Sequence, residues 1–301
     1  MTSFAINLRT MPSPLEILKQ FVHNPPDPVA IALAEDIGTG DVTCACFVAE
    51  EHRSAAKIFV KQDAAIAAGV EVAAEVFHLV DASLEVHIIR PSGSVLARGD
   101  SVLEVTGSTR SILTSERTAL NFIQQLSGVA TLTRKFVDAV KPYKARILDT
   151  RKTTPGLRSL EKTAVLSGGG TNHRFGLYDM AMVKENHVNA TDLAQLAENI
   201  RAFHVQHPDL RLELEAQSLQ QVRDFLTLDG IDVIMLDNMS LADMRAAVEL
   251  RGKKGVHFEA SGGVNLDTVA GIAATGVDFI SVGALTHSAP AVDFSLDIQS
   301  I

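Results

Sequence analysis

Charged side chains follow short apolar runs at regular intervals in the second half of this 301-residue chain. Arg151 and Lys152 follow one run, Lys184 ends the next, and Glu215 and Asp237 end two more. Buried parallel strands read as nearly continuous apolar runs, and in a β/α barrel their carboxyl ends converge on the face that holds the active site. We therefore expect these side chains to meet in one pocket, which indicates an enzyme.

The cations of this expected pocket suit a ligand with several negative charges. Arginine offers a planar fork that fits carboxylates and phosphates, whereas lysine acts as a compact point charge. The chain as a whole is acidic, with a formal net charge of −9, so a local group of cations is more informative than in a basic protein. The further candidates are Arg117 at the start of a long helix, and His173 and Arg174 after a glycine-rich loop.

Two glycine-containing turns follow the last strand-like runs. Ser261, Gly262 and Gly263 form one turn, and Gly283 and Ala284 begin the other. Free backbone N–H groups near a helix start bind phosphate, and many barrels hold a phosphate in the loops after their last strands. The two turns therefore predict phosphate binding as well as chain reversal.

Two carboxylates, Glu215 and Asp237, end neighbouring strand-like runs and are expected at the same mouth. Such groups bind ribose hydroxyls, hold Mg²⁺ indirectly, or stabilise positive charge that develops on a sugar carbon. Glu213 lies two residues before Glu215 and therefore faces the same side of a strand, so the sequence leaves open which of the two is functional. No spacing typical of a zinc or iron site is present.

The first half of the chain has a different pattern, which predicts a small domain of mixed strands and helices. Helices are expected at residues 14–22 and 29–35, with a proline-rich connector between them and a polar loop at 36–41. Turn residues such as Gly93 and Gly99 separate the later segments. Those segments are strands at residues 55–60, 84–90 and 101–105 and a helix at 70–79.

A long helix at residues 115–140 is expected to connect this domain to the second half, with Gly128 marking either a break or a close contact. Beyond it, strand-like runs alternate with helices, which is typical of βαβ units and a parallel sheet. We count six strands and an irregular seventh segment, which predicts an incomplete barrel; an open doubly wound sheet is the alternative that the pattern leaves open. The helices are expected near residues 159–167, 190–207, 219–228, 241–250 and 266–274.

Composition argues against several other classes of protein. The net charge disfavours a nucleic-acid-binding surface, and no apolar run approaches the roughly 20 residues that a membrane span needs. The two cysteines, Cys44 and Cys46, suit the reduced thiols of a cytoplasmic protein. The N-terminal segment lacks the apolar core of a signal peptide but is poor in acidic residues, which leaves a weak organelle-targeting segment as the alternative.

The most specific segments resemble the quinolinate phosphoribosyltransferase family. The motifs DTRKTTPG at 149–156, GGGTNHRFGLYD at 168–179 and KENH at 184–187 carry the resemblance. It is supported by EDIGTGD at 35–41, ERTALN at 116–121, EASGG at 259–263 and GALT at 283–286, so that it covers nearly the whole chain from residue 29 onward. One departure is Gln217, where the family usually has a further acid; Glu215 is still in place.

The resemblance implies an α/β fold in two parts. An N-terminal α/β sandwich domain is expected at residues 1–115, with the C-terminal tail at 288–301 as a candidate addition to it, and an incomplete (β/α) barrel at 116–287. The resemblance also implies a homodimer or a higher homo-oligomer with shared active sites, in which Arg117 reaches the neighbouring subunit's site.

The family's functional residues carry over by position in the same way. Its quinolinate contacts fall on Arg117, Arg151, His173 and Arg174, and Lys152 and Lys184 are shared with the phosphates. Glu215 and Asp237 fall on the ribose and magnesium side, and together with the two lysines they form the expected catalytic set. The remaining substrate contacts are Thr150 and the 5-phosphate loops at Ser261, Gly262, Gly263, Val282, Gly283 and Ala284.

The activity that follows is transfer of a phosphoribosyl group from phosphoribosyl pyrophosphate to quinolinate, with loss of pyrophosphate and CO₂, to give nicotinate mononucleotide for NAD biosynthesis. Mg²⁺ accompanies phosphoribosyl pyrophosphate, and no metal is expected to bind the protein directly. Two alternatives remain open: a paralogue of the same fold, such as one associated with molybdenum transport, that uses another acceptor, and an aldolase that forms a Schiff base on Lys152 or Lys184. A non-catalytic binding protein is disfavoured because so many charges converge.

Overall fold

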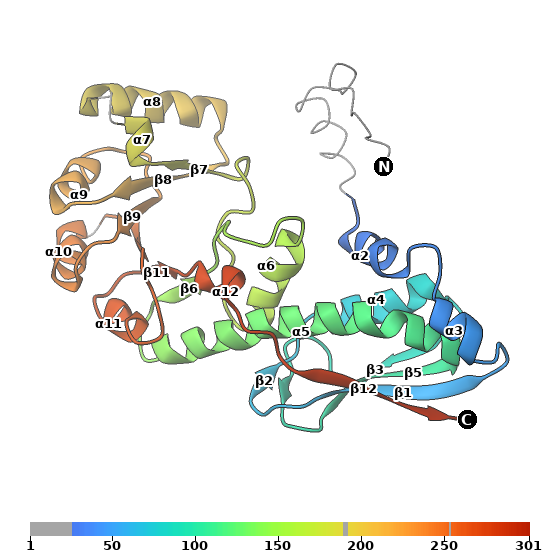
Figure 1. Cartoon of the computed structure of the whole chain (residues 1–301). Helices are drawn as coiled ribbons and strands as arrows, with labels where there is room; N and C mark the ends of the chain where they lie inside the picture. Colours follow the sequence, from blue (N-terminus) through green and yellow to red (C-terminus); the bar gives the residue numbers. More distant parts are fainter. Residues whose placement is uncertain (1–25, 189–191, 253) are drawn as a thin grey trace, which may run out of the picture.

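The chain, analysed as a computed structural model, is described over residues 26–188, 192–252 and 254–301. The helix expected at residues 14–22 lies outside the described residues. Two halves lie side by side: an antiparallel sheet with its helices, and a parallel sheet with helices of its own (Figure 1). Among the described residues, no helix combines the length and the apolar character needed to cross a bilayer.

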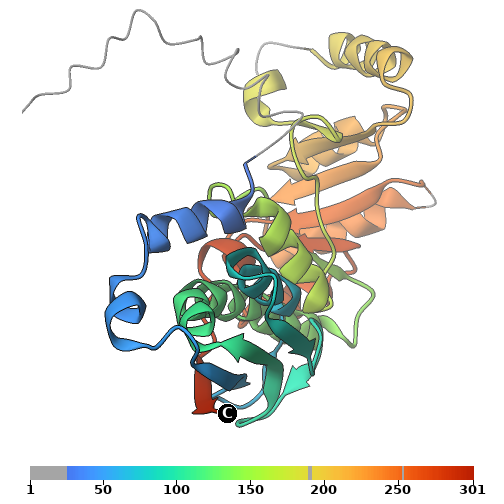
Figure 2. The same cartoon turned by 90° about the vertical axis from the view of Figure 1, so that its right-hand side faces the viewer.

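The N-terminal half is a four-stranded antiparallel sheet with helices packed over one face (Figure 2). Along β1, Arg53–Val60, every second side chain is buried, as expected for a strand with one face on a core and one toward solvent. The helix expected at 70–79 is α4, Val70–Val80, and the helix expected at 29–35 is α2, Pro28–Ile37. The sheet order is β12, Phe294–Ser300; β1; β5, Ser101–Ser108; and β3, Glu85–Ile88.

Three short elements of this half have no counterpart among the sequence predictions. Two are the strands β2, Ala65–Ile66, and β4, Val95–Leu96, which pair only with each other. The third is the helix α3, Val42–Phe47, whose start is capped by the Asp41 side chain accepting the N–H of Cys44 at 2.9 Å. Strands of two residues have no periodicity that a sequence pattern could reveal.

The last strand, β12, returns from the other half of the chain. It pairs antiparallel with β1, so that Ser300 lies opposite Ser54 and Phe294 opposite Val60. The C-terminal residues therefore complete the first sheet, and they anchor the parallel half to it at the point where the chain crosses back.

A single helix, α5, Thr109–Val140, connects the halves. Its buried side chains up to Ile123 belong to the core of the antiparallel half, and those from Leu126 onward belong to the core of the parallel half. A boundary drawn between residues 115 and 116 thus cuts a continuous helix. The break considered at Gly128 is wrong, because α5 continues through it. The close contact at Gly128 is with the segment that leads to β12 rather than with a helix: a Cβ there would lie 2.4 Å from the carbonyl oxygen of Pro290.

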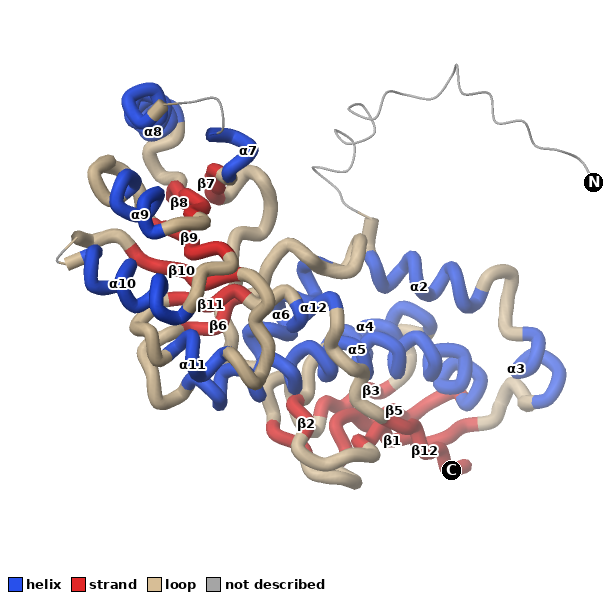
Figure 3. Tube along the Cα trace, turned by 60° about the vertical axis from the view of Figure 1, so that its left-hand side comes forward, coloured by secondary structure: helices blue, strands red, loops and turns tan. Residues whose placement is uncertain are grey.

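The C-terminal half confirms the incomplete barrel. Its six parallel strands run in the order β6-β11-β10-β9-β8-β7, and helices α8 to α11 lie along one side of them (Figure 3). Within the described residues no strand pairing joins β6 to β7. Thr171 forms an isolated parallel bridge with Leu148 of β6, which corresponds to the irregular seventh segment.

The bounds of these elements agree with the expected alternation to within a few residues. The strands are β6, Arg146–Leu148; β7, Met180–Val183; β8, Arg211–Ala216; β9, Val233–Asp237; β10, His257–Ser261; and β11, Phe279–Ser281. The helices are α6, Arg158–Ser167; α7, Glu185–Val188; α8, Leu193–Gln206; α9, Leu219–Phe225; α10, Leu241–Arg251; α11, Val269–Ala273; and α12, Ala284–His287.

Candidate active site

A pocket of about 560 Å³ opens at the carboxyl ends of the parallel strands. We call it the strand-end pocket. It is lined by eleven of the residues that the sequence singled out: Thr150, Arg151, Lys152, His173, Arg174, Lys184, Glu215, Asp237, Ser261, Gly262 and Gly263. The expectation that side chains far apart in sequence meet at one face of the sheet is therefore confirmed.

Four of the expected substrate contacts do not line this pocket. Arg117 is exposed on α5 and is absent from its lining. The side chain of Val282 is buried in the core of the parallel half. Gly283 lies behind the pocket, where an added Cβ would be 3.0 Å from Cδ of Lys152, and Ala284 begins the short helix α12.

Two arginines give the pocket its anion-binding character. The Nε of Arg151 is buried and has no hydrogen-bond partner among the described residues. Arg174 donates to the carbonyl of Met180 at 3.3 Å and to Sδ of Met182 at 3.5 Å, so neither bond neutralises its charge. Burial and the nearby positive charge of Arg151 lower the pKa of Arg174. Two crowded guanidinium groups with unused donors make a receptor for carboxylate or phosphate oxygens.

The imidazole of His173 lies against two buried carboxylates. Its Nε2 is 3.2 Å from Oε2 of Glu213 and 3.2 Å from Oε2 of Glu259, which come from β8 and β10. Its Nδ1 accepts the backbone N–H of Arg174 at 2.7 Å. Both ring nitrogens are thus engaged within the protein, so His173 meets a ligand with the remaining edge or face of its ring.

The protonation of this cluster follows from its burial. Although burial opposes a charge on the ring, the two carboxylates outweigh it and raise the pKa of His173 to about 10. Burial and the neighbouring Glu259 raise the pKa of Glu213 to about 7. The cluster therefore holds more protons at neutral pH than its members would in water. Because Nδ1 accepts the N–H of Arg174, the Nε2 proton faces the two carboxylates, and the raised pKa of Glu213 places a further proton on that pair.

The same three side chains have ligand atoms within 4.8 Å of one another, which is close enough for a metal ion. The ring N–H lies between the two carboxylates and accounts for their approach without an ion. We therefore interpret the group of His173, Glu213 and Glu259 as a proton-sharing cluster, and we call it the His–Glu–Glu cluster.

Glu213 and Glu215 differ in depth along β8. Both side chains face the interior of the open barrel, but Glu213 is completely buried, whereas Glu215 lies one pleat nearer the mouth. Glu215 pairs with Lys184, whose Nζ is 3.3 Å from Oε2 of the carboxylate. Glu215 is therefore the carboxylate that a ligand can reach, and Glu213 acts from below.

The turn after β10 lies beside the end of β9. Ser261 is in parallel register with Asp237, and Asn238 donates its backbone N–H to the carbonyl of Ser261 at 2.9 Å. Gly262 and Gly263 have φ of +95° and +60°, which favour glycine. An added Cβ at Gly262 would lie 2.2 Å from Oδ1 of Asn238, so the turn closes tightly and leaves its backbone open to the pocket.

Sequence reasoning missed part of the lining. The sequence identified Glu259 only as part of the EASGG motif and gave it no role. Nothing in its spacing distinguishes it from a strand residue that faces solvent. The same holds for the other pocket residues that the sequence did not single out, which are Met182, Met235, Asn238 and Ser281.

Comparison with known proteins covers most of the chain. Residues 41–127 match the profile described as "Quinolinate phosphoribosyl transferase, N-terminal domain". Residues 129–297 match "Quinolinate phosphoribosyl transferase, C-terminal domain". The two matches meet within α5, the helix that the two hydrophobic cores share.

Several named relatives align over nine-tenths of the chain. The chloroplastic nicotinate-nucleotide pyrophosphorylase (carboxylating) of Arabidopsis thaliana is 41% identical over 289 residues, covering 90% of this chain and 82% of the relative. The mitochondrial quinolinate phosphoribosyltransferase (decarboxylating) 2 of Nicotiana glauca is 40% identical over 287 residues, covering 90% and 81%.

Solved structures agree with this. The nicotinate-nucleotide pyrophosphorylase of Francisella tularensis superimposes with a TM-score of 0.83 at 38% identity, over 90% of this chain and 94% of that one. NadC of Streptococcus pyogenes superimposes with a TM-score of 0.85 at 35% identity, over 97% and 99%.

Proposed function

This chain belongs to the quinolinate phosphoribosyltransferase family, and we infer that it is a nicotinate-nucleotide pyrophosphorylase (carboxylating) of NAD biosynthesis. In this reaction quinolinate receives the phosphoribosyl group of phosphoribosyl pyrophosphate, and pyrophosphate and CO₂ leave. The observation that carries the inference is the pair Arg151 and Arg174 in a pocket that also holds Lys152, Lys184 and a glycine turn. The buried Nε of Arg151 has no partner among the described residues, and Arg174 donates to a carbonyl oxygen and a thioether sulfur rather than to a carboxylate.

Recognition of quinolinate is the role that we propose for the two arginines and His173. Quinolinate is a planar dicarboxylate, and a guanidinium fork binds a carboxylate through two parallel hydrogen bonds. The ring of His173 is held rigidly beside Arg174 by the 2.7 Å hydrogen bond between them. A rigid wall next to a cation fixes the plane of an aromatic ligand, and positioning of this kind lowers the barrier of a two-substrate reaction.

Phosphate binding is the role that we propose for the turns after β10 and β11. The turn at Ser261, Gly262 and Gly263 lines the pocket, and two of its three residues have no side chain to keep a phosphate from the backbone. Gly283 lies next to Lys152, and the turn of Val282, Gly283 and Ala284 would hold the 5-phosphate from behind that side chain. Thr150 precedes the cations and accepts the N–H of Lys152 at 3.0 Å, which orders the loop that carries them.

Stabilisation of the reacting sugar is the role that we propose for Glu215 and Asp237. Departure of pyrophosphate builds positive charge at the ribose C1, and carboxylates already fixed in a pocket stabilise such charge without reorganisation. Mg²⁺ would arrive with phosphoribosyl pyrophosphate on this side of the pocket, without a direct protein ligand, and would neutralise the leaving pyrophosphate. Lys152 and Lys184 would bind the phosphates, and Glu215 holds Lys184 in place.

Decarboxylation needs no additional base in this scheme. The pyridine nitrogen attacks C1 with its own lone pair and becomes cationic. That positive charge stabilises the carbanion left when the adjacent carboxylate departs as CO₂, and a proton from water then completes nicotinate mononucleotide. The task of the protein is to position the substrates and to match their charges.

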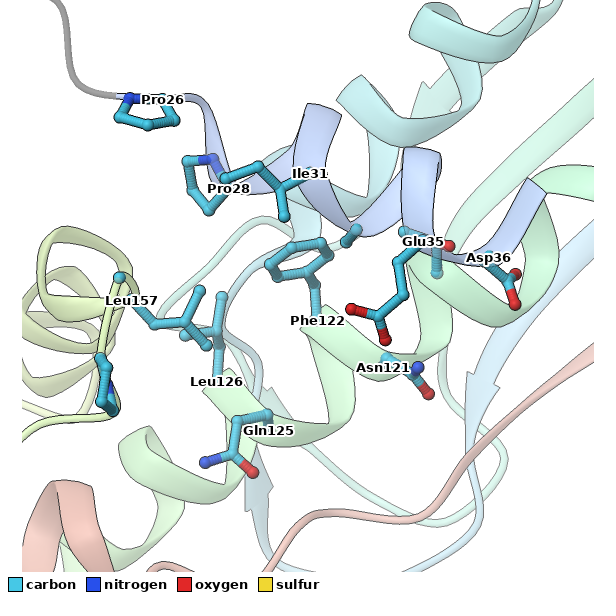
Figure 4. A pocket seen from close by; sticks show the side chains of 14 residues that line it. Pro26, Pro28, Ile31, Glu35, Asp36, Asn121, Phe122, Gln125, Leu126 and Leu157 are labelled. Atoms are coloured by element: carbon cyan, nitrogen blue, oxygen red, sulfur yellow. The ribbon is translucent and has the colours of Figure 1, made fainter. Parts of the chain in front are cut away.

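We propose that the active form is a homodimer or a higher homo-oligomer with shared sites. The exposed Arg117 lies beside a groove of about 480 Å³ between α2, α5 and the turn at Pro155–Gly156–Leu157. Figure 4 shows Phe122, Leu126 and Leu157 at this groove, with the carboxylate of Glu35 at its rim. A second copy covering this apolar face would bring Arg117 to the neighbouring pocket, since Arg117 lies one turn from Asn121 of the groove.

Mixed oligomers test this arrangement. Arg117→Ala and Asp237→Asn should each be inactive alone, because each removes one contribution to every site. In an equal mixture that has exchanged subunits, a site with both contributions forms again, and about one quarter of wild-type activity should return. Failure of the mixture to recover activity, with subunit exchange demonstrated, would show that Arg117 acts within its own chain or not at all.

The cytoplasm is the compartment that we propose. Cys44 is buried and Cys46 exposed, and both are free thiols, which suits a reducing compartment. Fractionation of cells that express the full chain tests this proposal, and recovery with an organelle fraction would refute it.

The activity itself is tested by supplying quinolinate, phosphoribosyl pyrophosphate and Mg²⁺ and by following CO₂ and nicotinate mononucleotide. Turnover of nicotinate without release of CO₂ would reject the carboxylating reaction, and turnover of another acceptor alone would identify a paralogue. Arg174→Ala should abolish quinolinate turnover in a protein that still folds by circular dichroism. Lys184 is ion-paired with Glu215, which suits an anion-binding role better than that of the Schiff-base nucleophile of an aldolase.

A further inference from the structure

Buried charges lie directly beneath the strand-end pocket. Among the described residues, five charged side chains are buried. One of them, Glu161, accepts the N–H of Thr154 at 3.0 Å. The other four all contact His173, and they are Asp149, Lys162, Glu213 and Glu259. Since burial of a charge is costly unless it is paired, this convergence on one residue calls for a reason.

Two of the four hold the backbone of His173. Its N–H donates to Oδ1 of Asp149 at 2.8 Å, and its carbonyl accepts from Nζ of Lys162 at 3.1 Å. Lys162 and Asp149 are themselves paired at 2.5 Å. The ion pair therefore binds both the backbone N–H and the carbonyl of His173, and it fixes the place where the loop after α6 enters the pocket.

The other two hold the ring. Glu213 and Glu259 approach the same atom, Nε2, from two strands that are separated in the sheet by β9. Neither oxygen of Glu213 has another partner, and Oε1 of Glu259 has none among the described residues. Two ionised carboxylates this close would repel each other strongly. One proton between them removes that repulsion and leaves one carboxylate to accept the ring N–H.

We propose that Glu213 and Glu259 are positioning residues for the dicarboxylate substrate, and that they act as a pair which carries one proton. This inference rests on the proposed function. The pair holds the ring of His173, and through the hydrogen bond from Arg174 to Nδ1 it fixes the start of the arginine that binds the substrate. Glu213 and Glu259 do not touch the substrate, so their effect is on its binding and orientation.

The proton also sets the charge beneath the pocket. Glu213 acts electrostatically on Arg174. While Glu213 is protonated, the positive charge of Arg174 is available to a carboxylate of the substrate. Once Glu213 ionises, it offers Arg174 an internal counter-charge and repels a dianion. The other charged groups that face the cluster, Asp149 and Lys162, are already paired with each other and leave this balance unchanged.

The test is the pH dependence of KM for quinolinate in three proteins. In the wild type, KM should be level below about pH 7 and rise above it, by at most about tenfold for each pH unit, because one proton is lost. Glu213→Gln keeps the shape of the protonated carboxyl, so KM should stay within about threefold of wild type at pH 6 and show no alkaline rise. Glu213→Ala should raise KM about tenfold to a hundredfold at every pH, the loss typical of residues that orient a binding group from behind it. KM for phosphoribosyl pyrophosphate should change little in either variant.

Asp278→Asn is the matched control. Asp278 accepts the N–H of Phe258 at 2.8 Å and so supports β10 from its opposite end. This variant should lose stability but keep the wild-type pH profile of KM for quinolinate.

Three results would overturn the inference. They are an alkaline rise that persists in Glu213→Gln, an unchanged KM in Glu213→Ala, and a stoichiometric metal ion in the purified protein that Glu213→Ala no longer carries. A wild type without quinolinate turnover would refute the proposed function instead. In that case infrared spectroscopy still decides the point: a protonated-carboxyl band that the wild type shows at pH 6 and Glu213→Gln lacks supports the shared proton, and absence of that band from the wild type refutes it.

Discussion

Replacing Lys162 with methionine should destabilise the protein strongly, although Lys162 lies outside the pocket lining. Its Nζ pairs with Asp149 at 2.5 Å, and both side chains are at most 2% exposed. Removing one partner of a buried ion pair leaves the other charge uncompensated, which costs about 3–5 kcal/mol. The loss should appear as a lower free energy of unfolding in urea at pH 7, followed by far-UV circular dichroism.

The pH dependence of this loss has a definite sign. Burial raises the pKa of Asp149 even though Lys162 opposes the shift. Without Lys162 the shift should be larger, so the folded state is penalised at every pH where Asp149 would be ionised in the unfolded chain. The deficit of Lys162→Met should therefore be largest at neutral pH and shrink as the pH falls toward about 4, where a protonated carboxyl needs no partner.

A double variant separates the charge from the packing. Asp149→Asn combined with Lys162→Met removes both charges, and the amide oxygen can still accept the N–H of His173. The double variant should recover at least about 2 kcal/mol relative to Lys162→Met alone, because no unpaired charge remains. A loss below about 1 kcal/mol in the single variant, or a double variant no more stable than the single one, would refute the view that Asp149 is ionised and depends on Lys162.

Three further predictions concern the pocket and the connecting helix. Arg151→Ala should raise KM for quinolinate about tenfold to a hundredfold, the equivalent of one charged hydrogen-bonding group. The KM of Arg151→Lys should lie between those of the wild type and Arg151→Ala, because lysine keeps the charge but lacks the guanidinium fork. Equal KM values in all three proteins would contradict an arginine contact. Gly262→Ala should weaken binding of phosphoribosyl pyrophosphate and lower the urea midpoint more than Gly263→Ala does. Both positions have positive φ, but only at Gly262 would the new Cβ overlap a side chain, 2.2 Å from Oδ1 of Asn238. A larger loss in Gly263→Ala would contradict this. Gly128→Ala should lower thermal stability by about 1–3 kcal/mol, because its Cβ would lie 2.4 Å from a carbonyl oxygen, whereas Gly271→Ala, with no atom nearer than 3.5 Å, should be neutral or slightly stabilising.

The pocket could be foreseen from the sequence because strand ends are visible in it. An apolar run that stops at a charged residue marks both a buried strand and the direction in which it ends. For parallel strands this is enough to place Arg151, Lys184, Glu215 and Asp237 around one mouth, and all four line the strand-end pocket. The periodicity that indicates the fold thus also indicates the site.

The supports beneath the pocket could not be foreseen in the same way. Asp149 and Lys162 are 13 residues apart, and their pairing depends on how α6 packs against the end of β6. Glu213 and Glu259 come from strands that are not neighbours in the sheet, and no short-range pattern relates them. From the sequence, a glutamate in a strand is equally compatible with a buried position and with one that faces solvent. Only the curvature of the open barrel brings the two together on Nε2 of His173.

The position of Arg117 marks another limit of sequence reasoning. The sequence groups Arg117 with the other cations of the expected pocket, but in the structure Arg117 is exposed on α5 and does not line the pocket of its own chain. The same helix shares its buried side chains between both cores, so it cannot turn without disturbing each of them. Arg117 is therefore fixed relative to the pocket of its own chain and stays outside it, which leaves a second chain as the route by which it could meet a substrate.

Charge balance explains why acids and bases lie so close together in this pocket. A dianionic acceptor and a phosphorylated donor need an excess of cations, which Arg151, Lys152, Arg174 and Lys184 supply. Unopposed cations in this pocket would repel one another; burial and, after it, the charge of Arg151 lower the pKa of Arg174. Carboxylates reduce that repulsion, but each ionised one also competes with the substrate. A buried pair that keeps one proton offers a compromise, because it fixes the geometry with two acids while adding only one negative charge.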